Sequence, residues 1–442
     1  MLLRATRRIA QTLGFALVSF IALSATAWPQ SMRLHFIDVG QGASTLIEFP
    51  CAAVLIDTGG ESNEEFDSTA ELSAYLQNFF AQRPDLHQTF HSLILTHPHI
   101  DHTRGVPTVI GRYKILNAVT NGQEDSSGGA QQKALHQKIS DAEGNADPSD
   151  DIGFVAAEVN KIPKNKGLTN SIIDPVKCPT VDPKITVLWG ASTTNPGWTQ
   201  TVFKNANNHS VVVRVDFGAS SFLDTGDLEE DAIANLLEHY QGSSLLKADV
   251  YEVGHHGSAN GTTEALLQAV SPKMAVMEMG PPTRELMWTA WKYGHPRKST
   301  IDLLETYVGG TRSPVTAKVA TAVSTFVSQR IDRAIYGTGW DGSLILEADT
   351  NGAWKQTLAA QGPQAAANAP QAAATDRVDV NAANVSELTT LPRIGPVRAQ
   401  AIVDYRTRNG RFRSIDDLGN VKGIGPATLL EIRDHVTVGT GN

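Results

Sequence analysis

The chain has few cysteines, no long internal apolar run and no excess of basic residues. Two cysteines in 442 residues exclude a small disulfide scaffold, and the internal apolar runs are too short for a membrane-spanning helix. Asp and Glu (46) outnumber Lys and Arg (37), giving a formal net charge of −9. This balance argues against a protein that binds nucleic acid over its whole surface. With 41% hydrophobic residues, the chain is long enough for two or three folded domains.

The N-terminus has the pattern of an export signal. Three arginines fall within the first eight residues, an apolar stretch covers about 13–27, and Ala25-Thr26-Ala27 follows the A-x-A pattern. We therefore predict a signal peptide over 1–27, cleaved after Ala27, and a periplasmic or secreted protein. The alternative is an uncleaved membrane anchor. An oxidising compartment would permit a Cys51–Cys178 disulfide, with two separately buried thiols as the alternative.

A low-complexity segment divides the rest of the chain. Residues 356–377 are dominated by Ala, Gln and Pro without apolar periodicity, which is typical of a flexible linker. The predicted domains are then 28–355 and 378–438. Residues 376–442 carry nine Arg or Lys against eight Asp or Glu, which leaves the central domain near −13 once the signal is removed. The acidic central domain alone is a poor electrostatic partner for DNA.

The central domain alternates short apolar runs with a helical pattern, which predicts an α/β fold. A helix is expected over 66–81. Residues 121–150, rich in Gly, Ser, Asp, Asn and Gln, suggest a surface insertion. Strands are expected over 32–39, 44–49, 53–58, 92–96, 211–217, 221–225 and 248–253.

Metal-ligand residues follow one of these runs directly. SLILT (92–96) leads into His97, His99, Asp101 and His102, three imidazoles and a carboxylate within six residues. The end of a buried strand presents such side chains together at a sheet edge. Imidazole and carboxylate suit Zn²⁺ or a neighbouring first-row ion, so this segment predicts a metal site. A surface histidine cluster is the alternative.

The H-x-H-x-D-H pattern resembles the metallo-β-lactamase superfamily. FLDTGD (222–227) and VGHHGS (253–258) follow in that superfamily's order. FIDVGQG at 36–42, NNHS at 207–210 and YGHP at 293–296 narrow the resemblance to the hydrolase domain of ComEC-type competence proteins, over about 32–350. The resemblance implies a four-layer αββα sandwich.

It also implies two divalent metal ions, zinc first and manganese as the alternative. His97 and His99 would hold one ion; Asp101, His102 and one of His255 or His256 would hold the other, with Asp227 bridging. Asp57 would lie near the metal loop, or serve as a turn residue. The superfamily has a third histidine that binds the first ion, and this sequence lacks it at the usual position. His209 is the only candidate to replace it, and its position does not match the register of the superfamily's motif. The residues implied in catalysis are Asp101, Asp227, His255, His256 and His295.

The C-terminal module repeats one pattern twice. Asn384 and Glu387 predict a capping box, Pro396 a helix start and Gly410 its end, while Ser414 caps a second short helix. The duplication is similar to the tandem helix-hairpin-helix domain of ComEA-type DNA receptors. Such turns present backbone N–H groups to phosphates, which predicts sequence-independent DNA binding. A protein-interaction module is the alternative. The expected DNA contacts are Arg393, Ile394, Gly395, Arg398, Lys422, Gly423, Ile424 and Gly425.

Together these patterns predict an exported metal-dependent hydrolase, first of all a DNA nuclease or phosphodiesterase using an activated water. One alternative is another hydrolase on the same scaffold, acting on phosphocholine esters, β-lactams or lactones. The other alternative is a DNA-capture protein without catalysis.

Overall fold

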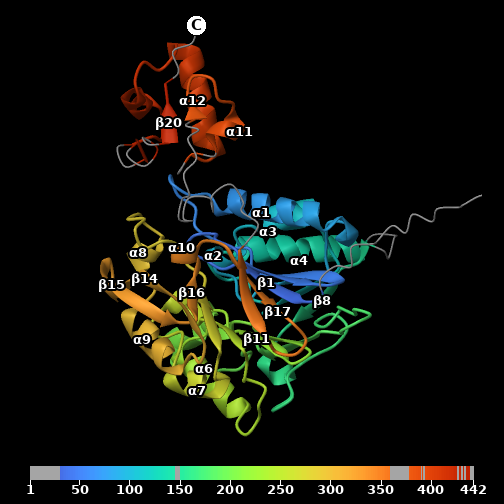
Figure 1. The fold of residues 1–442 in the computed structure, drawn as a ribbon. Coiled ribbons are helices and arrows are strands. Elements are labelled where there is room, and N and C mark those ends of the chain that lie inside the picture. Colours follow the sequence, from blue (N-terminus) through green and yellow to red (C-terminus); the bar gives the residue numbers. More distant parts are fainter. Residues whose placement is uncertain are drawn as a thin grey trace, which may run out of the picture.

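Two large β-sheets form the centre of the structure (Figure 1). The computed structural model describes residues 30–144, 150–358, 378–389, 391, 394–425, 428–429, 432 and 435–438. The predicted signal peptide and most of the predicted linker therefore lie outside the described residues. The first sheet runs in the order β18 (Trp354–Leu358), β17 (Leu344–Ala348), β1 (Met32–Phe36), β2 (Thr45–Phe49), β3 (Ala52–Ile56), β5 (Ser92–Ile94), β7 (Asn117–Thr120) and β8 (Gly153–Ala156).

The second sheet has six strands. Its order is β16 (Ile335–Gly337), β13 (Met274–Met277), β12 (Val250–Glu252), β11 (Ser220–Asp224), β10 (Val212–Phe217) and β9 (Lys184–Trp189). From β11 to β16 the strands are parallel, as they are from β3 to β8 in the first sheet. Parallel strands bring their carboxyl ends to one edge, where loops can assemble a site.

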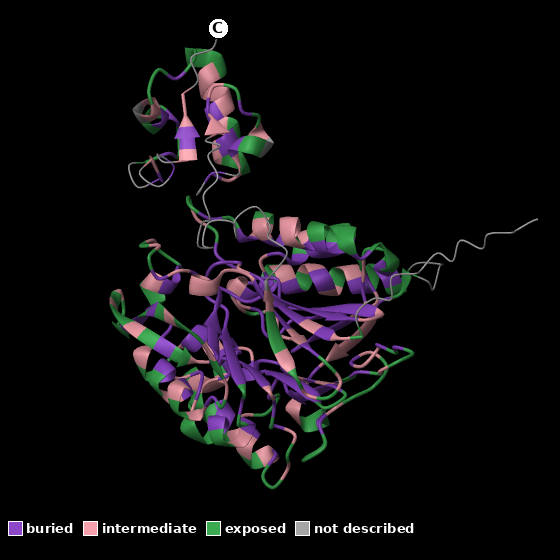
Figure 2. Ribbon diagram, in the orientation of Figure 1, coloured by how far each residue is buried: buried purple, intermediate pink, exposed green. Residues whose placement is uncertain are grey.

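Side-chain alternation explains how the sheets pack. In β3, Val54 and Ile56 join the core that also contains residues of the second sheet, such as Val213 and Phe222. Leu55 points the other way, into a separate core under the first sheet's helices. Figure 2 shows the resulting buried layers of strand between the helices. Because these strands are covered on both faces, their sequences read as continuous apolar runs.

Helices cover both outer faces, which confirms the predicted αββα sandwich (Figure 1). The first sheet is covered by α1 (Ser68–Gln82), α3 (Val106–Arg112) and α4 (Gly129–Glu143). The second is covered by α6 (Glu230–His239), α7 (Glu264–Val270) and α9 (Lys298–Tyr307). Asp67 caps α1 by accepting hydrogen bonds from the amides of Thr69 and Ala70.

One prediction about the central domain was wrong. Residues 121–150 are not a simple surface insertion, because α4 lies within them and buries Leu135 and Ile139 against the first sheet. A helix needs an apolar residue only every third or fourth position, so the Gln- and Ser-rich remainder hid it.

Smaller elements complete the central domain. The described chain also has a long hairpin of β14 (Thr311–Ala322) and β15 (Thr325–Arg333), which the sequence did not reveal. Strand β18 continues three residues into the predicted linker and pairs with β17. The remaining elements are η1 (Pro84–Leu86), β4 (Thr89–Phe90), α2 (Ile100–Thr103), β6 (Lys114–Ile115), η3 (Val159–Lys161), α5 (Gln200–Lys204), η4 (Ala206–His209), η5 (Gly254–Gly257), α8 (Ala290–Tyr293) and α10 (Thr338–Asp341).

The two cysteines form a disulfide. Cys51, in the turn between β2 and β3, is bonded to Cys178, which precedes β9, with 5.5 Å between their Cα atoms. The bridge joins segments 127 residues apart and ties the first sheet to a segment packed against the second. Of the two alternatives that the sequence left open, the structure contains the disulfide.

The C-terminal module has its own apolar core, which includes Ile402, Leu418 and Ile424. Its described elements are β19 (Val378–Asp379), α11 (Val385–Leu388), α12 (Pro396–Asn409), η7 (Ile415–Asn420) and β20 (Val436–Thr437). The predicted capping box at Asn384 is present, and α12 begins at Pro396 and ends at Gly410.

Ser414 also caps η7 through a box with Asp417, as the repeat predicts. Val397, in the first turn of α12, is 84% exposed.

None of the helices in the described part of the chain combines the length and apolar character needed to cross a bilayer.

Candidate metal centre

The H-x-H-x-D-H segment lies where β5 ends. His97 follows the strand closely, and the chain then turns into α2, which carries Asp101 and His102. The loop after β3 supports this turn: the amide of Thr58 donates to the carbonyl of His102 at 2.7 Å. Any Cβ on Gly59 would lie 1.7 Å from the carbonyl oxygen of Asp101, so only glycine permits this close approach.

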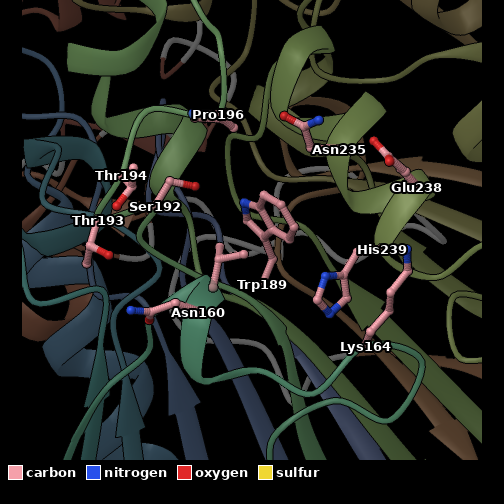
Figure 3. A pocket seen from close by; sticks show the side chains of 11 residues that line it. Asn160, Lys164, Trp189, Ser192, Thr193, Thr194, Pro196, Asn235, Glu238 and His239 are labelled. Carbon is pink, nitrogen blue, oxygen red and sulfur yellow. The ribbon is translucent and has the colours of Figure 1, made fainter.

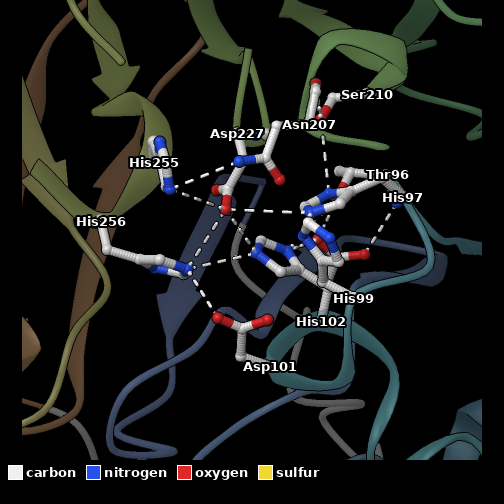
Figure 4. A network of polar contacts seen from close by, with 12 residues as sticks. Thr96, His97, His99, Asp101, His102, Asn207, Ser210, Asp227, His255 and His256 are labelled. Carbon is white, nitrogen blue, oxygen red and sulfur yellow. Dashed lines mark hydrogen bonds and ion pairs between the residues drawn. The ribbon is translucent and has the colours of Figure 1, made fainter. Parts of the chain in front are cut away.

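Two overlapping groups of side chains converge at this point (Figure 4). His97, His102 and Asp227 offer ligand atoms within 4.8 Å of one another, and so do Asp101, His102 and His256. Asp227 follows β11, and its Oδ2 lies 3.2 Å from Nε2 of His102 and 3.6 Å from Nε2 of His256. Nδ1 of His99 lies 2.9 Å from Nε2 of His97. Strand ends of both sheets thus meet in one buried cluster.

Hydrogen bonds on the far ring nitrogens orient these histidines. Nδ1 of His102 lies 2.6 Å from Oδ2 of Asp57, and Nδ1 of His256 donates to the carbonyl of Glu278 at 2.7 Å. Nδ1 of His97 contacts the hydroxyls of Thr96 and Ser210. Each contact turns Nε2 toward the cluster, as in metal sites where a second hydrogen bond fixes the ring.

The electrostatics suit a cation. Burial holds the pKa of His97 well below its usual value, so its imidazole is neutral and keeps a lone pair. Burial would raise the pKa of Asp227, but the neighbouring His102 and His256 hold it well below the usual range. Burial would lower the pKa of His102, but the carboxylates of Asp227 and Asp57 hold it well above its usual value. The cluster therefore joins anionic oxygens to imidazoles, the donor set that zinc and its neighbours prefer.

The adjacent histidines of VGHHGS have different surroundings. Nε2 of His256 lies 3.2 Å from Nε2 of His102 and 3.5 Å from Oδ2 of Asp101. Nε2 of His255 lies 3.9 Å from Asp227, and its Nδ1 contacts Asn260 instead. Both histidines have a positive φ, a conformation that is costly for residues other than glycine and recurs at functional sites.

His209 does not join the cluster. Its Nδ1 accepts a hydrogen bond from the amide of Ser192 at 3.0 Å, and its Nε2 donates to the carbonyl of Phe203 at 2.7 Å. Both ring nitrogens are therefore taken by backbone groups, and none is left for a metal. The expectation that His209 replaces the third histidine thus finds no support in its geometry.

Asn207, two residues earlier, does reach the cluster. Its Nδ2 donates to Oε1 of Glu229 at 2.9 Å and lies 3.4 Å from Nε2 of His255. That orientation leaves Oδ1 buried without a hydrogen-bond partner among the described residues. Figure 4 shows the amide beside Asp227, facing the cluster. NNHS was singled out in the sequence, but nothing in the sequence distinguished Asn207 from its neighbours.

His295 lies beside the cluster rather than in it. Its ring centroid is 5.8 Å from that of His255 and 6.2 Å from that of His256. Nδ1 accepts from the side-chain Nε2 of Gln41 at 3.2 Å, and burial, with the two neighbouring histidines, holds the pKa of His295 well below the usual value.

A separate pocket of about 300 Å³ lies between the end of β9 and α6 (Figure 3). Trp189, Asn235 and His239 line it, and no residue of the histidine and aspartate cluster does. No sequence pattern predicted this pocket, and none of the proposed metal ligands lines it.

The C-terminal module brings its two hairpins together. Gly423 has a φ of +91°, and a Cβ placed on it would lie 3.5 Å from Cγ of Arg398. Arg398 lies on α12, after the first hairpin turn, while Gly423 belongs to the second. Ile394 and Ile424 are buried, so the backbone around them is held by packing. Lys422 is exposed, and Arg393 lies outside the described residues.

Two models of known families match parts of this chain. A model of the metallo-β-lactamase superfamily matches residues 37–277, and a model of the helix-hairpin-helix motif matches residues 373–437.

Curated relatives also match parts of this chain. Recombination protein 2 of Haemophilus influenzae is 27% identical over 283 residues, 64% of this chain and 27% of the relative. ComE operon protein 3 of Bacillus subtilis is 26% identical over 313 residues, 69% of this chain and 34% of the relative. ComE operon protein 1 of the same organism is 41% identical over 61 residues, 14% of this chain and 30% of the relative. The chain thus spans about a third or less of each relative's length.

Proposed function

Because this chain belongs to the metallo-β-lactamase superfamily, with a helix-hairpin-helix motif after that domain, we propose that it is an exported metal-dependent phosphodiesterase that cleaves DNA. The buried cluster around Asp227 is the observation that carries the proposal. One carboxylate there lies within 4 Å of nitrogens of His97, His102 and His256, the arrangement needed to hold two cations close together.

The proposed ligands of the first ion are His97, His99 and Asp227, and those of the second are Asp101, His102, His256 and Asp227. Oδ1 of Asn207 is a further oxygen donor for the first ion, in place of the missing third histidine, because it is buried and has no hydrogen-bond partner among the described residues. Leaving such an acceptor unmatched is costly, and a cation would satisfy it.

Two divalent ions in this site would supply a water nucleophile at neutral pH and stabilise negative charge on a phosphoryl oxygen. We assign the role of proton acceptor for that water to Asp101, the more exposed carboxylate of the cluster. His255 and His295, which lie next to the cluster, would donate hydrogen bonds to a phosphodiester.

The C-terminal module supports DNA as the substrate. Its Gly-rich turns, with Arg398 beside Gly423, can contact phosphates without reading bases. The predicted linker would keep bound DNA near the metal site at an effective concentration of ~mM, which would offset repulsion from the acidic central domain. The Cys51–Cys178 disulfide supports export, because structural disulfides persist in oxidising compartments.

The test incubates residues 28–442 with plasmid and with linear single-stranded DNA, in Mn²⁺, in Zn²⁺ and in a chelator. We expect cleavage with metal, none with chelator and none in Asp227→Asn. A chromogenic cephalosporin and a small aryl phosphodiester test the other hydrolase classes. Hydrolysis of the cephalosporin with intact DNA would contradict the proposal, and so would DNA binding without cleavage under any metal.

A further inference from the structure

A row of aromatic rings leads from the metal cluster to the surface. The ring of His295 lies 6.2 Å from that of His256, at 30°. Tyr293 stacks on His295 with centroids 5.7 Å apart and planes 22° apart, and Trp288 lies 6.4 Å from Tyr293. Exposure rises outward along the row: His295 is 6% exposed, Tyr293 38% and Trp288 65%. The row thus connects the buried ligands to solvent.

The loop before α8 exposes the side chain of Trp288 to solvent. Trp288 has a φ of +64°, a strained conformation for a bulky residue. The buried hydroxyl of Thr289 fixes the loop, lying 2.8 Å from the carbonyl of Leu286 and accepting from the amide of Lys292. Because an exposed indole gains little packing from this geometry, the strain points to a ligand outside the fold.

Two cationic side chains come from the same segment of the chain. Lys292, on α8 between Trp288 and Tyr293, is exposed and makes no ion pair with any described residue. Arg297 follows His295 and donates to the carbonyl of Tyr293 at 3.2 Å. Aromatic faces and neighbouring cations are the two elements with which proteins bind single-stranded nucleic acid.

We propose that Trp288 and Tyr293 form a stacking platform for unpaired bases beside the scissile phosphate, so that the preferred substrate is single-stranded DNA. The inference rests on the proposed function and specifies its substrate class. Bases within a duplex are already stacked on one another and expose only their edges, whereas unpaired bases have free faces for Trp288 and Tyr293.

The test compares KM for single-stranded and duplex oligonucleotides of equal length. We expect Trp288→Ala to raise the KM for single strands about tenfold, with a much smaller change in kcat. Trp288→Phe should keep the KM close to that of the parent chain. Trp288→Leu, which keeps bulk without an aromatic face, should raise the KM as Trp288→Ala does. Val327→Ala removes an exposed apolar side chain from β15 and serves as the control that leaves the KM unchanged.

A binding measurement separates failure of this inference from failure of the nuclease proposal. With metal chelated, a homothymidine oligonucleotide should quench tryptophan emission in the parent chain, and much of the quenching should vanish in Trp288→Phe. If DNA is never cleaved but this quenching occurs, the platform stands and the nuclease proposal falls. If parent and variant are quenched equally, or KM is unaffected by Trp288→Leu, the platform is overturned.

Discussion

At the scale of single residues, Asp57 shows how the site depends on a side chain that would hold no metal. Its carboxylate contacts Nδ1 of His102 at 2.6 Å and the hydroxyl and amide of Thr96. Asp57 has a φ of +55°, a conformation that asparagine also tolerates. Asp57→Asn therefore keeps the backbone and removes the anion that orients His102.

We expect Asp57→Asn to weaken metal binding about 10- to 100-fold, as loss of such partners does elsewhere. Calorimetric titration of zinc into the metal-free protein measures the change. Asp67→Asn is the matched control, since either residue can cap α1 far from the cluster. Equal affinities in the parent chain and Asp57→Asn would show that His102 needs no partner.

Asn207 gives a second prediction at this scale. Asn207→Ala removes the unpaired Oδ1, so we expect the weaker of two bound ions to lose at least tenfold in affinity, while Asn207→Asp, which keeps an oxygen there, retains both. Equilibrium dialysis with metal analysis gives the stoichiometry. Two tightly bound ions in Asn207→Ala would rule out Asn207 as a ligand.

At the scale of elements, a buried ion pair joins the end of α1 to β2. Nη1 of Arg83 lies 2.6 Å from Oε1 of Glu48 and 3.1 Å from the carbonyl of Phe49. Burial would raise the pKa of Glu48, but His35 and Arg83 outweigh it and lower the pKa from 4.5 to about 2. The stabilisation is therefore complete above about pH 4.5 and is lost as the pH falls toward 2.

We expect Arg83→Ala to lower the free energy of unfolding by about 3–5 kcal/mol at pH 7, because Glu48 stays buried and loses its shortest ion pair. The difference from the parent chain should shrink below pH 4.5, as Glu48 becomes protonated. Urea unfolding at several pH values measures both effects. Arg330→Ala, which breaks an exposed pair with Asp332, should change stability by less than about 1 kcal/mol; an equal effect would contradict the argument.

The elements also show what the sequence could and could not predict. Apolar runs predicted the strands that lead into His97 and Asp227, because strands buried on both faces leave continuous apolar sequence. Helix α4 was missed, since its buried residues are spaced among Gln and Ser. His256 rather than His255, and Asn207 rather than His209, are proposed as metal ligands because of backbone dihedrals and hydrogen bonds to distant carbonyls. Residue type and spacing do not encode those contacts.

At the scale of the whole molecule, the disulfide links two segments that the chain brings together only on folding. A crosslink closing 127 residues removes much conformational freedom from the unfolded chain. We expect the double variant Cys51→Ala, Cys178→Ala to lose about 3–5 kcal/mol of stability. Urea unfolding of the parent chain with a reductant should reproduce the loss, and an unchanged midpoint would mean that the bridge contributes nothing.

The most direct test of the central claim adds metal to the metal-free chain in steps while bound metal and cleavage of single-stranded DNA are both recorded. We predict that cleavage rises with occupancy of the cluster, reaches its maximum at two ions per chain, and is absent in Asp227→Asn at any metal concentration. Two bound ions with intact DNA, or equal cleavage in Asp227→Asn, would contradict this prediction.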